Sequence, residues 1–209
     1  MSVYESTFAQ SDKTDAILVV KPEEERCSDS DEEYASPAQK YIRRGLARQR
    51  FPAYRPSPIR TTKKLHVNKA LLSHHSDYFK ELFATDSGEK SPPEFQIEDV
   101  NLEDFATLLS LVHESPITFQ ESAAERLLKL AYRFQLPAAK HHVELFLMAS
   151  SSFSRDSKFQ LADKYNLETL LKSSISNISS VWACPKESTL KGLSDKTNVR
   201  IFHRLIDLE

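Results

Sequence analysis

The stretch that decides the fold runs from Lys64 to Phe83 and reads KLHVNKALLSHHSDYFKELF. Apolar and polar residues alternate over residues 65–68, which is the two-residue period of a half-buried strand. From Lys69 onward the apolar spacing lengthens to three and four residues, the period of a helix, and Ser76 is a candidate break. The sequence therefore predicts a strand that leads directly into two short helices.

This pattern resembles the hallmark of the BTB (POZ) domain, a strand ending in His-Val-x-Lys, a Leu-Leu helix, a serine and an aromatic-rich second helix. The matching positions are His66, Val67, Lys69, Leu71, Leu72, Ser76, Phe79, Leu82 and Phe83. The resemblance implies an α+β fold, in which a three-stranded sheet is capped by about five helices. It also implies protein recruitment rather than chemistry.

Residues 12–20 end in a second apolar, β-branched run that predicts another buried strand, and Asp15 takes the place of the aspartate that commonly precedes it in the family. In the family this strand pairs with the next one, yet more than forty residues separate Val20 from Leu65. These residues are poor in apolar side chains, acidic first and basic later. Loop closure costs entropy only logarithmically, so we expect a BTB domain over residues 1–149, interrupted by a disordered charged insert at about 21–62.

The remaining chain predicts one more strand and a series of helices. Phe95 and Ile97 alternate with polar neighbours as in an edge strand, and Asn101 has the place of a helix N-cap. Further helices are predicted to begin near Glu121 and at Pro137. Residues 150–209 stay helical, and about sixty residues are few for an independent core, so we expect an extension that packs back on the domain.

Composition excludes several functional classes. The chain has 28 basic and 30 acidic residues, so no overall field attracts it to nucleic acid or to a membrane surface. Cys27 and Cys184 are isolated, which provides neither a disulfide framework nor a zinc spacing. No secretory signal and no apolar run near the roughly 20 residues of a membrane span is present. We expect a soluble protein of the cytoplasm, the nucleus or both.

The sequence predicts no catalytic site, no metal site and no cofactor. Its three glycines are isolated, which excludes the common phosphate-binding loops, and no nucleophile elbow occurs. The pairs His74-His75 and His141-His142 are adjacent residues, which point about 100° apart on a helix and cannot easily bind one ion.

Two features of the insert suggest regulation. Aromatic residues are interleaved with arginines between Lys40 and Arg55, a pattern that can contact phosphates and bases. The adjacent acidic half would neutralise this segment at short range, so nucleic-acid binding is the weaker hypothesis. Ser28 and Ser30 each precede an acidic residue at the third position, which makes them candidates for acidophilic kinases.

The resemblance also implies partners. BTB domains dimerise through their first helices, here through Leu71, Leu72 and His75, as homodimers or with other BTB proteins. Many members bind cullin-3 and act as substrate adaptors of a ubiquitin ligase. The family's cullin surface combines the second helix, a hydrophobic-x-Glu motif in the next loop and an aromatic residue near the end of the next long helix. These positions are Tyr78, Phe79, Leu82, Ser87, Glu89 and His113.

Ser87 replaces the hydrophobic anchor of this motif, and losing a buried apolar anchor at an interface often costs a few kcal/mol. The sequence thus predicts a non-catalytic adaptor with weakened cullin-3 binding. One alternative is a dimerising scaffold without ligase association. The other is a nucleic-acid-associated regulator that acts through the basic part of the insert.

Overall fold

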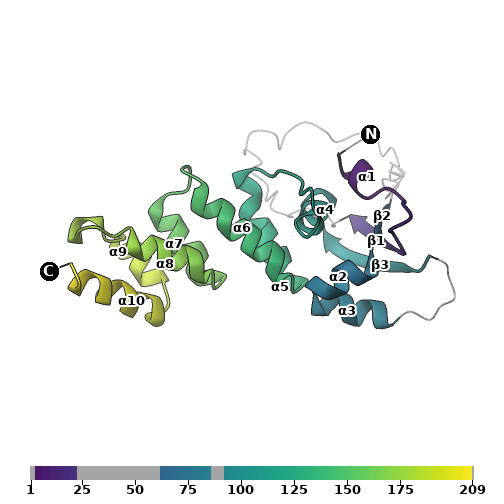
Figure 1. Ribbon diagram of the computed structural model, residues 1–209. Coiled ribbons are helices and arrows are strands. Elements are labelled where there is room, and N and C mark those ends of the chain that lie inside the picture. Colours follow the sequence, from purple (N-terminus) through teal and green to yellow (C-terminus); the bar gives the residue numbers. More distant parts are fainter. Residues whose placement is uncertain (1–2, 23–61, 86–91, 209) are drawn as a thin grey trace, which may run out of the picture.

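The computed structural model describes residues 3–22, 62–85 and 92–208, in which a small sheet is followed by a long series of helices. The sheet with α1–α4 forms one end of the molecule, α5 and α6 lie in the middle, and α7–α10 form the other end (Figure 1). Five helices, α2–α6, follow the first strand pair in the chain, which agrees with the predicted number. The elements are α1 (Val3–Thr7), β1 (Ala16–Pro22), β2 (Lys63–Val67), α2 (Lys69–His75), α3 (Asp77–Ala84), β3 (Glu94–Val100), α4 (Leu102–Ser110), α5 (Ala124–Arg133), α6 (Pro137–Ala149), α7 (Arg155–Lys164), α8 (Glu168–Ser176), α9 (Glu187–Gly192) and α10 (Asp195–Ile206).

Strand β1 is the middle strand of the sheet. It pairs antiparallel with β2 and parallel with β3, in the order β2-β1-β3, and Leu18 lies opposite Leu65. The predicted pairing across the insert is therefore confirmed. The insert predicted from about residue 21 follows the end of β1, which includes Lys21 and Pro22 after a shift in its register with β3. Residues 23–61 of the predicted insert lie outside the described part of the chain.

Two side chains attach the start of α2 to this sheet. Asn68 accepts a hydrogen bond from the Leu71 N–H at 2.8 Å, and its own amide donates to the Lys13 carbonyl at 2.8 Å. The Asp15 carboxylate accepts from the Lys69 N–H at 2.7 Å. Because the first N–H groups of a helix have no partner within the helix, these bonds fix the start of α2 to the segment that leads into β1.

Ser76 separates α2 from α3, as predicted. Its backbone is extended, with φ −149° and ψ 121°, so the helix cannot continue through it. Its Oγ accepts from the Phe79 N–H at 3.1 Å and donates to the Phe134 carbonyl at 2.6 Å. One buried hydroxyl therefore begins α3 and binds it to the end of α5.

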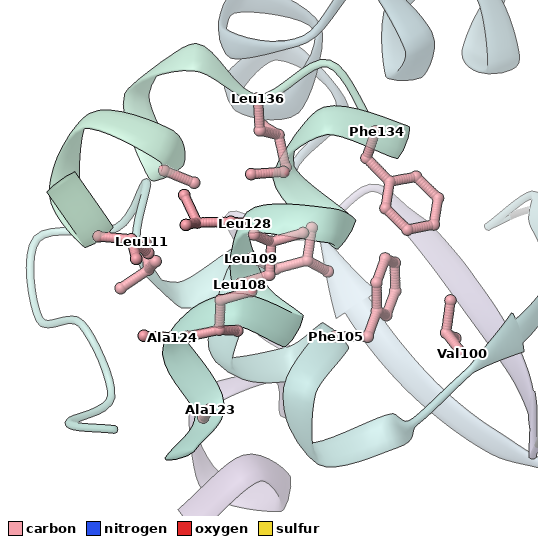
Figure 2. Packing of buried hydrophobic residues seen from close by; sticks show 14 of the residues in the cluster. Val100, Phe105, Leu108, Leu109, Leu111, Ala123, Ala124, Leu128, Phe134 and Leu136 are labelled. Carbon is pink, nitrogen blue, oxygen red and sulfur yellow. The ribbon is translucent and has the colours of Figure 1, made fainter. Parts of the chain in front are cut away.

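An aromatic cluster fills the space between α3, α4 and α5. The Phe79 and Phe134 rings are stacked with their centroids 5.7 Å apart, and Phe105 lies 5.0 Å from Phe134. Figure 2 shows Phe105 and Phe134 facing each other, with Val100 beyond Phe105. All three phenylalanines are fully buried, and each such burial contributes about 1.5–3 kcal/mol. This cluster holds α3 against α4 and the end of α5.

The C-terminal helices pack on α6, as predicted for the extension. The Glu144 carboxylate is buried at 5% exposure and accepts from the Leu170 N–H at 2.8 Å, which satisfies the start of α8. Lys140 donates to the Asn166 carbonyl at 3.1 Å. Buried residues such as Phe159 and Ile201 join the same apolar core as the sheet. The extension therefore shares the core of the domain.

The Ser76 bonds allow a direct test of this packing. Ser76→Ala removes the cap of α3 and leaves the buried Phe134 carbonyl without its donor, so the free energy of unfolding should fall by about 1–3 kcal/mol. Urea denaturation measures the change. Ser73→Ala, in the same region of α2 at a half-buried position, is the matched control and should change stability by less than about 0.5 kcal/mol. Equal losses in both variants would contradict this account.

Candidate functional site

The candidate partner surface begins on the outer side of α3. Tyr78 and Leu82 are half-buried there, and the Tyr78 ring contacts Phe134 edge-on with a centroid distance of 5.1 Å. Phe79 is 0% exposed, so the prediction that Phe79 contacts a partner is wrong. It lies on the stripe of Ser76 and Phe83 that faces the core, and its role is to hold α3.

The loop part of the predicted cullin surface cannot be placed. Ser87 and Glu89 fall within residues 86–91, outside the described ranges, and the same holds for the candidate phosphorylation sites Ser28 and Ser30. The hydrophobic-x-Glu motif and the modification sites therefore stay predictions from sequence.

His113 follows the end of α4 and lies beside the N-terminal segment. Its ring packs edge-on against Phe8 with centroids 5.7 Å apart. Together with Leu71 and His66 it lines a groove of about 580 Å³. This groove lies between the N-terminal segment of residues 6–14, the end of β2 and the start of α2. Tyr78 and Leu82 do not line this groove. The structure therefore groups His113 with a candidate dimerisation residue, and its part in the cullin-3 surface stays a prediction from sequence.

The environment of His113 favours the neutral ring. Its Nε2 atom is buried and has no hydrogen-bond partner within the described chain. Burial lowers the pKa of His113 below its ordinary value, because a charged imidazolium would lose solvation without gaining an acceptor. The ring that packs against Phe8 therefore favours its uncharged form.

The predicted dimerisation residues on α2 differ in accessibility. Leu71 and His75 are half-buried, and the His75 ring lies 4.9 Å from that of exposed His74. Leu72 is 1% exposed and packs in the core, so its predicted contact with a second subunit is wrong. The accessible face of α2 therefore consists of Leu71, His75 and their polar neighbours.

An exposed tyrosine that the sequence reasoning missed lies close to α3. Tyr132 is 79% exposed and lines a groove of about 510 Å³ with Asp77, the first residue of α3, and Lys140 of α6. Exposed aromatic residues beside a groove are typical interface anchors. The sequence did contain a signal for its exposure, because Tyr132 lies next to the apolar stripe of Leu128 and Ala131 on α5 and not on it. The α3 face thus continues onto the junction of α5 and α6.

The structure also bears on membranes and metals. Among the residues it describes, no helix is long and apolar enough to span a bilayer. The same residues contain no group of three or more His, Cys, Asp or Glu side chains arranged to bind a metal ion. His141 instead faces Glu144, with Nδ1 and Oε2 3.3 Å apart.

Comparison with known proteins agrees with this geometry. Residues 59–151 match the family model of the BTB/POZ domain. The chain is 36% identical over 149 residues to BTB/POZ domain-containing protein Y57A10B.3 of Caenorhabditis elegans, an alignment that covers 70% of this chain and 47% of that protein. It is 29% and 30% identical over 149 residues to BTB and MATH domain-containing proteins 36 and 38 of the same organism, covering 70% of this chain and 47% and 38% of theirs.

The chain carries a BTB/POZ domain, and such domains are generally non-catalytic modules for protein interaction. The matched range begins after β1, and the structure adds β1 as the middle strand of the same sheet. The chain spans less than half the length of these three relatives.

The partly buried imidazole of His113 predicts a pH dependence. In the unfolded chain a histidine binds its proton near pH 6.5, whereas the lowered pKa of His113 means that the native ring binds its proton less readily at that pH. The unfolded state therefore binds more protons below about pH 6.5, and stability should fall as the pH decreases from 7.5 to 5.5.

His113→Phe keeps an aromatic ring against Phe8 but removes the titrating group, so its urea midpoint should fall less over this pH range than that of the wild type. His74→Phe, at an exposed position of α2, is the control and should follow the wild type. Parallel pH profiles for wild type and His113→Phe would contradict the assignment.

Proposed function

We propose that this chain is a BTB adaptor of the cytoplasm or nucleus that recruits proteins to a cullin-3 ubiquitin ligase. The observation that carries the proposal is the outer face of α3, where Tyr78 and Leu82 stay accessible while Ser76 and Phe79 hold the helix in the core. A surface that is already ordered loses little conformational entropy on binding. The resemblance to the BTB family assigns the second helix to cullin-3.

Tyr132 extends this surface. The groove that it lines reaches Asp77 at the start of α3, so one partner helix can contact both elements. An aromatic anchor here offsets part of the binding that Ser87 is expected to lose in place of an apolar residue. The proposed cullin-3 surface therefore combines Tyr78, Leu82 and Tyr132 with the loop residue Glu89.

The proposal includes dimerisation through α2, as a homodimer or with another BTB protein. The accessible residues Leu71 and His75 lie on that helix, and Leu71 also lines the groove that contains His113. A twofold dimer presents the same patch on both subunits, so two α2 helices would face each other. Each adaptor would then carry two α3 faces. The names of the relatives that combine BTB and MATH domains support an adaptor, because they join this module to a second domain.

Loop residue 87 gives the most direct test. Binding of the purified chain to the N-terminal region of cullin-3 is measured by biolayer interferometry. Ser87→Met restores the apolar anchor and should tighten binding about tenfold, since anchor residues carry a large share of interface energy. Glu89→Lys should abolish binding.

Ser122→Met is the matched control. Ser122 is exposed and lies in the short 3-10 helix Glu121–Ala123 that precedes α5, outside the predicted cullin-3 surface. It should bind cullin-3 as the wild type does. Absence of binding by both the wild type and Ser87→Met would refute the ligase proposal. If light scattering then still shows a dimer, the chain is a scaffold.

A further inference from the structure

The last helix, α10, carries an apolar stripe on the side that faces away from the core. Val199, Phe202 and Ile206 are 54%, 62% and 54% exposed, whereas Thr197 and Ile201 on the opposite side are each 2% exposed. Because the three exposed residues follow helical spacing, they line up along one face. A continuous apolar face in solvent is typical of an interaction site.

A groove of about 350 Å³ runs beside this stripe, between α10 and α8. Val199 from the stripe and Ile175 of α8 supply its apolar surface. The remaining lining residues are mostly polar or charged: Lys172, Ser176, Arg200, His203, Arg204 and Asp207. One side chain of a partner can enter the groove between α8 and α10, while the adjacent side chains of the same partner contact its charged residues.

The charges on this side are predominantly positive. Lys172, Arg200 and Arg204 line the groove, and Lys196 lies one helical turn before Arg200. The carboxylates on the same side are Glu168 and Asp207, and exposed Asp195 lies one turn before Val199 in line with the stripe, so four cations against three anions leave a net charge of +1. Glu168 already pairs with Arg200 at 3.1 Å and with Lys172 at 3.5 Å. The opposite flank of the stripe carries Asn198 and Leu205.

The docking face is fixed before any partner arrives. The Asp163 carboxylate accepts hydrogen bonds of 2.6 Å from both the Ser194 and Thr197 hydroxyls, which hold the start of α10 against α7. Near the other end, Arg204 Nε donates to the Ile178 carbonyl at 3.2 Å. A preformed helix face of this kind binds with a small entropy cost.

We propose that the α10 stripe and the basic groove beside it form a docking site for an amphipathic helix of another protein, one with an apolar stripe and carboxylates along one flank. The partner's apolar residues would cover Val199, Phe202 and Ile206, and its carboxylates would meet Lys196 and Arg204. The site lies at the opposite end of the molecule from the sheet and α3 (Figure 1). It does not rest on cullin-3 binding.

The charge distribution disfavours a second copy of the chain in this place. If two α10 helices docked antiparallel about a twofold axis, each flank would face its own image. The flank with Lys196, Arg200 and Arg204 carries Asp207 as its one anion on α10, so its net positive charge would oppose an identical flank, which is destabilising. An acidic flank on a different protein avoids this repulsion.

A designed helical peptide tests the site, with leucines at three- and four-residue spacing and glutamates along one flank. Fluorescence anisotropy with the full chain should show saturable binding that weakens as salt is added. Phe202→Ser, at an exposed position, should weaken binding at least about tenfold, and Lys196→Glu should weaken it at low salt. The matched controls Leu145→Ser and Lys80→Glu change an exposed leucine and an exposed lysine elsewhere, and should bind like the wild type.

Three results would overturn the proposal. The first is equal affinity for a peptide in which the glutamates are replaced by lysines. The second is unchanged binding by Phe202→Ser. The third is a concentration-dependent self-association of the chain, measured by light scattering, that Phe202→Ser removes and Leu145→Ser does not, because a second copy would then cover the stripe.

Discussion

The rest of the structure depends on β1 lying between β2 and β3. Residues 16–20 are all buried, and β1 is the strand that joins the other two into one sheet. Its partner β2 follows only after the long charged segment between Pro22 and Lys63. Since closing a longer loop costs little additional entropy, the pairing tolerates this separation. The domain is therefore continuous in space although its first strand is distant in sequence.

A few polar contacts fix the positions of the helices relative to this sheet. Asp15 and Asn68 fix the start of α2, and Ser76 fixes the start of α3 to the end of α5. With the helices held in this way, their apolar side chains point inward, and those of α3 join the aromatic cluster. The side chains on the opposite sides of α2 and α3 stay accessible. A rigid interior with ordered exterior faces suits a module whose work is binding. The second exposed face, on α10, is held in the same manner through Asp163.

Local patterns predicted the elements well, because strand alternation, the Asn101 cap and Pro137 at a helix start are encoded in neighbouring residues. Accessibility was harder to predict. Phe79 and Leu72 belong to the motif that identified the domain, yet both are buried, since a motif residue can be kept for packing as easily as for binding. Tyr132 was missed because the groove beside it combines elements that are distant in sequence. Sequence spacing along one helix does not reveal such neighbours.

Amide hydrogen exchange tests the central claim, the pairing of β1 with β2 across the intervening segment. If β1 is the middle strand, its amides at residues 17–20 exchange only through global unfolding, with the same free energy as the amides of α4. Replacing Leu18 by proline, which removes a donor from the centre of the sheet, should unfold the whole domain. Rapid exchange at residues 17–20 in a chain whose α4 amides stay protected would contradict the account.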